Sequence, residues 1–129
     1  MLFKVCPPGW DMLRNSCYKL VDGRQGQVAS RTICESMGGR LALISSQEEM
    51  DAARSYMQDF SGRAFIEGTD AAQEGVWVGT TGNEIPYSGW TGNEPNGGTD
   101  ENCKAIEASE VFDNGCIGSQ WVTLALCEQ

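Results

Sequence analysis

Histidine is absent from all 129 residues of this chain. The chain therefore lacks the commonest general base, the proton relay of hydrolase triads and the usual ligand of catalytic zinc. One enzyme alternative would be a glycosidase, which needs paired carboxylates in a cleft, such as Glu94 with Glu101 or Asp113. We expect no enzyme, because glycosidase acids need an apolar pocket that raises their pKa, whereas ligation of a metal ion would keep these carboxylates ionised and occupied.

Basic residues and long apolar runs are also scarce. Nine Lys and Arg face 18 Asp and Glu, so the net charge is −9, which repels phosphate backbones and anionic headgroups. Apolar runs such as Leu41–Ile44 are far shorter than the roughly 20 residues of a membrane span. We expect no nucleic-acid partner and no membrane insertion. Met1–Val5 is too short for a signal peptide, so we expect Met1 to begin a mature domain.

Cysteine, in contrast, is present six times, at positions 6, 17, 34, 103, 116 and 127. An even number of cysteines spread over the chain indicates disulfides, an oxidising compartment and a secreted protein. The rival interpretation is a metal-thiolate cluster, but no pair has the short spacing of zinc sites. Six cysteines permit 15 pairings, and spacing favours only the local loop Cys6–Cys17.

The remaining pattern predicts one α+β domain over residues 1–129. Cys6–Leu20 is typical of a hairpin at the edge of a sheet, and Leu41–Ile44 of a buried strand. Apolar periodicity predicts a helix over Gln27–Met37, and Ser46 with Glu49 has the spacing of a capping box that opens a second helix through Phe60, ended by Gly62. Beyond Gly62, glycine-rich sequence with short apolar pieces favours strands and long loops. The last strand is expected within residues 119–126.

One glycine-rich loop, residues 92–103, concentrates oxygen donors. Glu94, Asn96 and Glu101 could supply three of the roughly six to eight oxygens that calcium takes. A solvated turn has a similar composition, because Asn, Asp, Gly and Pro are also the ordinary turn residues.

The order of the motifs resembles the long form of the C-type lectin-like domain over essentially the whole chain. This resemblance implies two helices flanking small antiparallel sheets, a long calcium-binding loop region and three disulfides, pairing Cys6 with Cys17, Cys34 with Cys127, and Cys103 with Cys116. The matching residues are Cys6-Pro-Pro-Gly-Trp10, Ser16-Cys17-Tyr18, Cys34, Gly38-Gly39-Arg40-Leu41-Ala42, Ser45 to Glu49, Thr69-Asp70, Glu74-Gly75-Val76-Trp77, Trp90, Glu94-Pro95-Asn96, Glu101-Asn102-Cys103, Cys116 and Cys127-Glu128.

In calcium-dependent members, a Glu-Pro-Asn triplet with a cis proline supplies two ligands of the principal calcium ion. By resemblance, Glu94 and Asn96 take these roles and Glu101 is a third ligand. Proline makes a cis bond inexpensive, at about 0.5 to 1 kcal/mol.

Family members complete the site with Trp-Asn-Asp, where this chain has Val111-Phe112-Asp113. Asp113 fits the role of ligand, but Phe112 has no oxygen to coordinate. Two alternatives follow: four ligands hold calcium more weakly, or a one-residue bulge lets Asp113 and Asn114 replace the Asn-Asp pair. A second calcium site is implied at Asp70 and Glu74, with help from Asn102.

The resemblance also implies that calcium binds two adjacent sugar hydroxyls, with Glu94, Asn96, Glu101 and Asp113 contacting the sugar. Glu-Pro-Asn is similar to the motif of mannose-type binders, whose ligands include mannose, glucose, N-acetylglucosamine and fucose, whereas galactose binders usually carry Gln-Pro-Asp. The expected partners are glycans with mannose-type terminal sugars. Because single sites bind weakly, we also expect a non-covalent homodimer or higher oligomer.

The alternative function is a lectin-like domain that has lost sugar binding and binds a protein ligand or ice. Phe112 favours it. Trp10, Trp77 and Trp90 are expected in the core, whereas the role of Trp121 stays open. We interpret four other acidic residues as solvated surface charges: Asp22, Asp59, Glu107 and Glu110.

Overall fold

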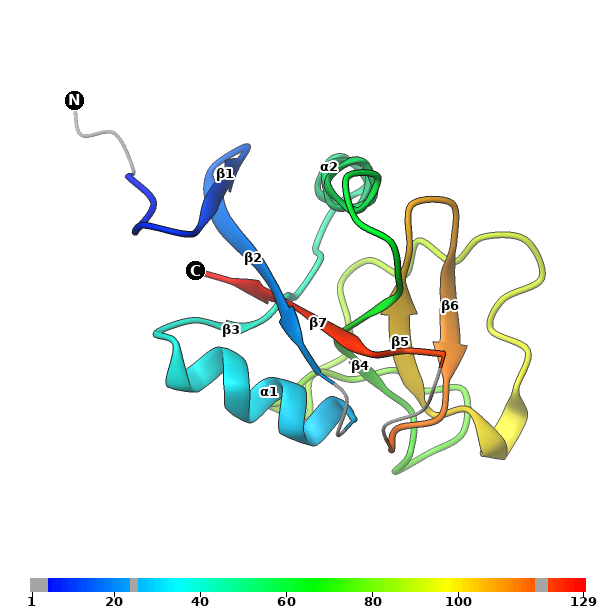
Figure 1. Cartoon of the computed structure of the whole chain (residues 1–129). Helices are drawn as coiled ribbons and strands as arrows, with labels where there is room; N and C mark the ends of the chain where they lie inside the picture. Colours follow the sequence, from blue (N-terminus) through cyan, green and yellow to red (C-terminus); the bar gives the residue numbers. More distant parts are fainter. Residues whose placement is uncertain (1–4, 24–25, 118–120) are drawn as a thin grey trace.

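The computed structural model of the protein describes residues 5–23, 26–117 and 121–129. Within these residues the chain forms two α-helices, a short 3-10 helix and seven strands (Figure 1). In chain order they are β1 (Asp11–Leu13), β2 (Ser16–Asp22), α1 (Gln27–Ser36), β3 (Arg40–Leu41), α2 (Gln47–Met57), β4 (Ala64–Thr69), η1 (Gly98–Asp100), β5 (Cys103–Ile106), β6 (Val111–Asn114) and β7 (Leu124–Glu128).

The strands form one mixed sheet rather than the small antiparallel sheets that we expected. Its order is β1-β2-β7-β4-β5-β6, and β3 also pairs with β7. The C-terminal strand β7 causes the difference, because it lies between β2 and β4, antiparallel to the first and parallel to the second. The α+β class is confirmed, and β6 forms the edge of the sheet opposite to β1.

The N-terminal hairpin and the three disulfides agree with the sequence analysis. Among the strands of the described residues, β1 pairs only with β2, at one edge of the sheet. The bonded cysteines are Cys6 with Cys17, Cys34 with Cys127, and Cys103 with Cys116. The second bond joins α1 to β7, and the third joins β5 to the segment after β6. Covalent links therefore join three strands of the sheet, β2, β7 and β5, to segments beside them.

Both helices form where periodicity and capping predict them. Ser46 caps α2 by accepting a hydrogen bond from the Glu49 amide at 3.1 Å, while the Glu49 carboxylate accepts one from the Ser45 hydroxyl at 2.8 Å. The prediction that α2 continues through Phe60 is wrong. The amides of residues 58–60 bond three residues back instead of four, which tightens the end of the helix. Phe60 is consequently exposed and packs against the Tyr56 ring.

Two predicted strands have different bounds. β3 covers only Arg40–Leu41 instead of Leu41–Ile44, because the Leu43 amide bonds the Glu128 carboxylate at 3.1 Å instead of a neighbouring strand. The final strand begins at Leu124 instead of within residues 119–121. Residues 119–120 lie outside the described residues, and Trp121 precedes β7. Trp121 therefore lies outside the final strand in which we expected it.

The core consists of two apolar clusters. One contains residues of α2, including Met50, Ala53 and Met57, with Trp90 packed against it. The other contains Cys34 of α1 together with Phe65 and Phe112 of the sheet, with Trp10 packed against it. Trp77 contacts Trp90 with ring centroids 4.8 Å apart. These contacts confirm the expected core positions of Trp10 and Trp90 and place the half-buried Trp77 beside them.

Candidate calcium and glycan site

The candidate site lies where the loop of residues 92–102 runs beside the edge strand β6 (Figure 1, yellow and orange). The peptide bond between Glu94 and Pro95 is cis, as the resemblance implies. The loop then turns through η1 before it enters β5. The site is thus built from one irregular segment and one regular strand.

Asp113 joins these two segments. Its side chain is only 3% exposed. Its Oδ1 accepts a hydrogen bond from the Asn96 amide at 3.0 Å, and its Oδ2 accepts one from the Gly97 amide at 2.9 Å. The Asp113 amide in turn donates to Glu94 Oε1 at 3.3 Å. Bonds to an ionised acceptor are among the stronger protein hydrogen bonds, so Asp113 fixes the loop on β6.

Gly97 is required at this point of the loop. A Cβ atom there would overlap the Glu101 side chain. The absence of a side chain lets Glu101 fold back over the loop while the Gly97 amide still reaches Asp113.

A depression of about 370 Å³ brings together all five residues predicted for the principal calcium ion. Both loop and strand contribute to its lining, and the same residues include the whole predicted sugar-binding set. The predicted residues that line it are Glu94, Asn96, Glu101, Asp113 and Asn114.

The carboxylates of this depression repel one another. Burial, and then the adjoining Asp113, raise the pKa of Glu94 to about 7. Burial, followed by the charges of Asp113 and Asp100, also raises the pKa of Glu101. The ionised forms are therefore costly without a neutralising cation.

A second group of predicted ligands, Asp70, Glu74 and Asn102, adjoins the first. The Asp70 amide bonds the Asn102 carbonyl at 3.1 Å, and Asp70 Oδ2 accepts from the Gly75 amide at 2.9 Å. The Oδ1 atoms of Asp70 and Asn102 are buried with no hydrogen-bond partner. Desolvation, and then the Asp70 carboxylate, raise the pKa of Glu74, with a smaller contribution from Asp113.

The donors of both groups suit calcium. Among the residues that the structure describes, no three His, Cys, Asp or Glu side chains converge as a metal centre by themselves. Amide oxygens of Asn96, Asn102 and Asn114 complete the donor set, and calcium accepts amide and carboxylate oxygens alike. The two orphaned buried oxygens and the raised carboxylate pKa values are features that an oxygen-liganded cation would relieve.

Phe112 occupies the place where related domains carry an asparagine. It is 7% exposed and belongs to the second core cluster. The register of β6 against β5 is continuous, with Lys104 opposite Asp113 and Cys103 opposite Asn114. The bulge that we considered is therefore absent. Asn114, the last residue of β6, nevertheless lines the depression.

Three residues that line the depression were not predicted as part of the site: Arg63, Glu110 and Trp121. Arg63 precedes β4 and carries no motif; strand pairing alone brings it to the site. Glu107 is also more than a solvated charge, because it accepts a hydrogen bond from Arg63 Nε at 2.9 Å and is half-buried. The aromatic side chain of Trp121 was compatible with a role in binding. That role could not be inferred before its position in the wall of the depression was known.

Lys104 stabilises the long loop that contains Tyr87 and Ser88. Its side chain is buried, its Nζ donates to the carbonyls of Tyr87 and Ser88, and it lies 4.8 Å from the centroid of the Trp90 ring. Burial lowers the pKa of this ammonium to about 8. The backbone carbonyls and the aromatic face are the contacts that hold the buried charge.

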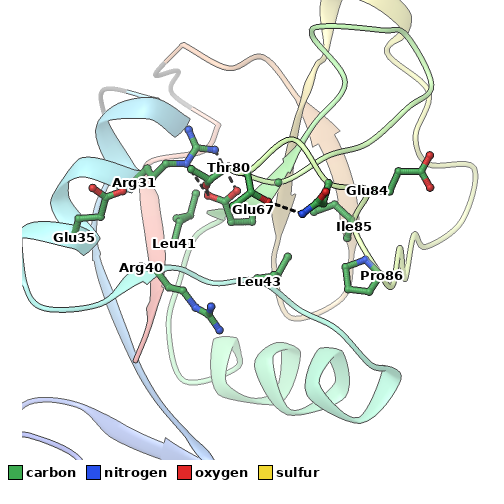
Figure 2. Close-up of a pocket in the computed structure, with 13 residues that line it drawn as sticks. Arg31, Glu35, Arg40, Leu41, Leu43, Glu67, Thr80, Glu84, Ile85 and Pro86 are labelled. Carbon is green, nitrogen blue, oxygen red and sulfur yellow. Dashed lines mark hydrogen bonds and ion pairs between the residues drawn. The ribbon is translucent and has the colours of Figure 1, made fainter.

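A larger cavity of about 420 Å³ lies away from these residues, between α1 and the loop of residues 79–86 (Figure 2). Glu67, 6% exposed, lies in its wall. It accepts hydrogen bonds from Arg31 Nε at 2.7 Å and from the Thr80 hydroxyl at 2.7 Å. Because protein donors satisfy this carboxylate, we assign it a structural role that joins β4 to α1 and to the loop.

Residues 24–129 match the sequence model of the lectin C-type domain. The chain is 31% identical over 130 residues to the low affinity immunoglobulin epsilon Fc receptor of Mus musculus, covering 96% of the chain and 39% of the receptor. It is 28% identical over 126 residues to the galactose-specific lectin nattectin of Thalassophryne nattereri, covering 95% of the chain and 74% of the lectin. The chain spans 29% to 39% of the length of the first four curated relatives.

Two solved structures have the same fold. The carbohydrate-recognition domain of cow CD23, described in the presence of a GlcNAc2Man3 oligosaccharide, has a TM-score of 0.79 and 26% identity, covering 97% of this chain and 95% of that one. A calcium-independent type II antifreeze protein has a TM-score of 0.78 and 26% identity, covering 97% of this chain and 94% of that one.

Proposed function

Because the chain belongs to the lectin C-type domain family, whose domain is a binding module rather than an enzyme, we propose that it is a calcium-dependent lectin for glycans that end in mannose-type sugars. One observation carries this proposal. The depression beside β6 gathers Glu94, Asn96, Glu101 and Asp113, with Asn114 beside them.

The protein's part in recognition is to hold these oxygens in place. Glu94 and Asn96 lie on either side of the cis bond, one an acceptor and the other both donor and acceptor. Asp113 fixes the loop that carries them through its two backbone hydrogen bonds. When bound, calcium supplies coordination positions for two adjacent sugar hydroxyls.

Two observations support the mannose-type preference over galactose. The residues flanking Pro95 are Glu and Asn, in the order typical of mannose-type binders. The related cow CD23 domain is described with a mannose-containing oligosaccharide. Nattectin, which is galactose-specific by name, shows that relatives at similar identity differ in sugar.

We further propose an extracellular protein whose domains act in groups. Three disulfides favour an oxidising compartment. No helix among the described residues is long and apolar enough to span a membrane. Because one shallow site gives weak binding, a homodimer or higher oligomer would raise avidity.

The test is calorimetric titration of mannose and galactose in millimolar calcium, repeated with EDTA. We expect binding of mannose that EDTA abolishes. The double variant Glu94→Gln with Asn96→Asp should shift the preference towards galactose, whereas Glu84→Gln, an exposed carboxylate outside the depression, should change nothing. Equal binding of mannose with and without EDTA would reject calcium dependence.

A second candidate function is calcium-independent binding of a protein or of ice. The likeness to a calcium-independent antifreeze protein and the apolar Phe112 favour it. It predicts no heat of sugar binding in either buffer, from a protein whose folding is verified by circular dichroism. Measurement of thermal hysteresis would then test the ice-binding alternative.

A further inference from the structure

The depression extends beyond the predicted calcium ligands to a wall formed by Arg63, Phe112 and Trp121. Trp121 is 61% exposed, although burial of a tryptophan side chain is strongly favourable. An exposed aromatic face inside a depression that also contains converging polar groups is typical of a ligand-binding surface.

Arg63 is held in the wall from two directions. Its guanidinium carbon lies 5.1 Å from the centroid of the Phe112 ring, and its Nε donates to Glu107 Oε2 at 2.9 Å. None of the described residues accepts a hydrogen bond from its two terminal amino groups. Arg63 therefore presents pre-oriented donors to a ligand in the depression.

Phe112 has no oxygen that could contact a ligand, but its ring contacts Arg63. The asparagine of related domains would contact the sugar itself, whereas Phe112 turns into the core and supports Arg63 with its ring face. Arg63, instead of the residue at position 112 of β6, therefore supplies the hydrogen-bond donor.

The charges of the depression select the kind of ligand. Glu94, Glu101, Glu110 and Asp113 line it together with Arg63, which is already paired with Glu107. Carboxylates outnumber cations, so a sulfated or carboxylated sugar would be repelled even beside one calcium ion. A neutral sugar can instead accept hydrogen bonds from Arg63 and lay an apolar face on Trp121.

We propose that Arg63 and Trp121 form a second sugar subsite beside the calcium ligands, so that the preferred ligand is a neutral oligosaccharide of at least two residues. This inference rests on the proposed function, because the calcium site positions the terminal sugar. The neighbouring sugar lies on Trp121 and bonds Arg63. The volume of about 370 Å³ lies in the range of sites for ligands larger than a fragment.

The experiment compares methyl mannoside with methyl mannobioside by calorimetry in millimolar calcium. The wild-type protein should bind the disaccharide about tenfold more tightly than the monosaccharide, equivalent to ~1.4 kcal/mol. Trp121→Ala and Arg63→Gln should each bring this ratio close to one. The matched controls are Phe60→Ala, another exposed aromatic, and Arg14→Gln, an exposed arginine outside the depression, and both should keep the wild-type ratio.

Four results would overturn the inference. Equal wild-type affinities for the two sugars would remove the subsite while leaving the proposed function intact. A disaccharide preference retained in both variants would place the second sugar elsewhere. Tighter binding of a sulfated mannobioside than of the neutral one would reject the neutral ligand. Absence of binding to either sugar would instead reject the proposed function, and the subsite with it. Trp121→Ala changes an exposed residue, so it remains informative if Arg63→Gln does not fold.

Discussion

Asp113 and Glu94 should respond differently to loss of their charge, although both line the same depression. Asp113→Asn leaves one carbonyl oxygen for two backbone amides and turns an NH2 group towards the other amide. A hydrogen bond to a charged group contributes about 1.5 to 3 kcal/mol. We therefore expect Asp113→Asn to lower the free energy of unfolding in EDTA by about 2 kcal/mol. This loss lowers the melting temperature by roughly 6 to 10 °C for a domain of this size.

Glu94→Gln should change the free energy of unfolding in EDTA only slightly. Glu94 accepts one long hydrogen bond, at 3.3 Å from the Asp113 amide. Its pKa of about 7 shows that its ionised form is already disfavoured, chiefly by burial. Glutamine keeps the acceptor without the charge, so we expect a change within about 0.5 kcal/mol.

Thermal unfolding, followed by circular dichroism in EDTA and in calcium, distinguishes a structural role of a residue from a role as a calcium ligand. For a Kd of roughly 0.1 to 1 mM, about 10 mM calcium stabilises the wild type by about 1.4 to 2.7 kcal/mol, or roughly 4 to 13 °C. Both variants should lose most of this rise, and Glu84→Gln should retain it. If Asp113→Asn melts with the wild type in EDTA, the described anchoring of the loop is wrong. A full calcium response from Glu94→Gln would remove Glu94 from the ligand set.

Three further predictions concern the surrounding structure. Gly97→Ala should displace the Glu101 side chain and reduce the calcium-dependent rise in melting temperature, and an unchanged rise would contradict the overlap. Glu67→Gln leaves the Arg31 charge poorly paired and should cost about 2 to 3 kcal/mol in urea unfolding, at or below the low end for buried pairs because Arg31 is partly exposed. Burial, and then the hydrogen bond to Asp11, raise the pKa of Tyr56 above its ordinary 10. The unfolded state loses this proton first, so stability should fall as the pH rises through about 10, and Tyr56→Phe should flatten that slope.

Local patterns predicted the helices and the hairpin because their determinants lie close together in sequence. Ser46 and Glu49 are three residues apart, and the capping bond between them forms as expected. The end of α2 was harder, since its final turns tighten without a glycine or proline to mark the place. β3 was overestimated because a side chain from the other end of the chain, Glu128, takes the Leu43 amide.

The candidate site could be predicted where it follows the loop, but not where distant strands complete it. Glu94, Asn96 and Glu101 share one segment, and the resemblance to the family motif before Cys116 implies Asp113. Arg63 reaches Phe112 only because β5 lies between β4 and β6 and aligns Phe65, Ala105 and Phe112 across the sheet. The resemblance to the family indicates that Phe112 stands where an asparagine is usual, whereas the position of Arg63 over its ring depends on long-range pairing.

The order of the strands also affects how this protein can be handled and displayed. β1 and β2, near the N-terminus, and β7, at the C-terminus, lie together towards one side of the sheet, and the depression borders β6 at the opposite edge (Figure 1). A linker or affinity tag that follows β7 would therefore be attached on the side of the sheet away from the depression. Copies fixed through the C-terminal end to a sensor surface or a scaffold would present the depression beside β6 outward, towards a surface facing them.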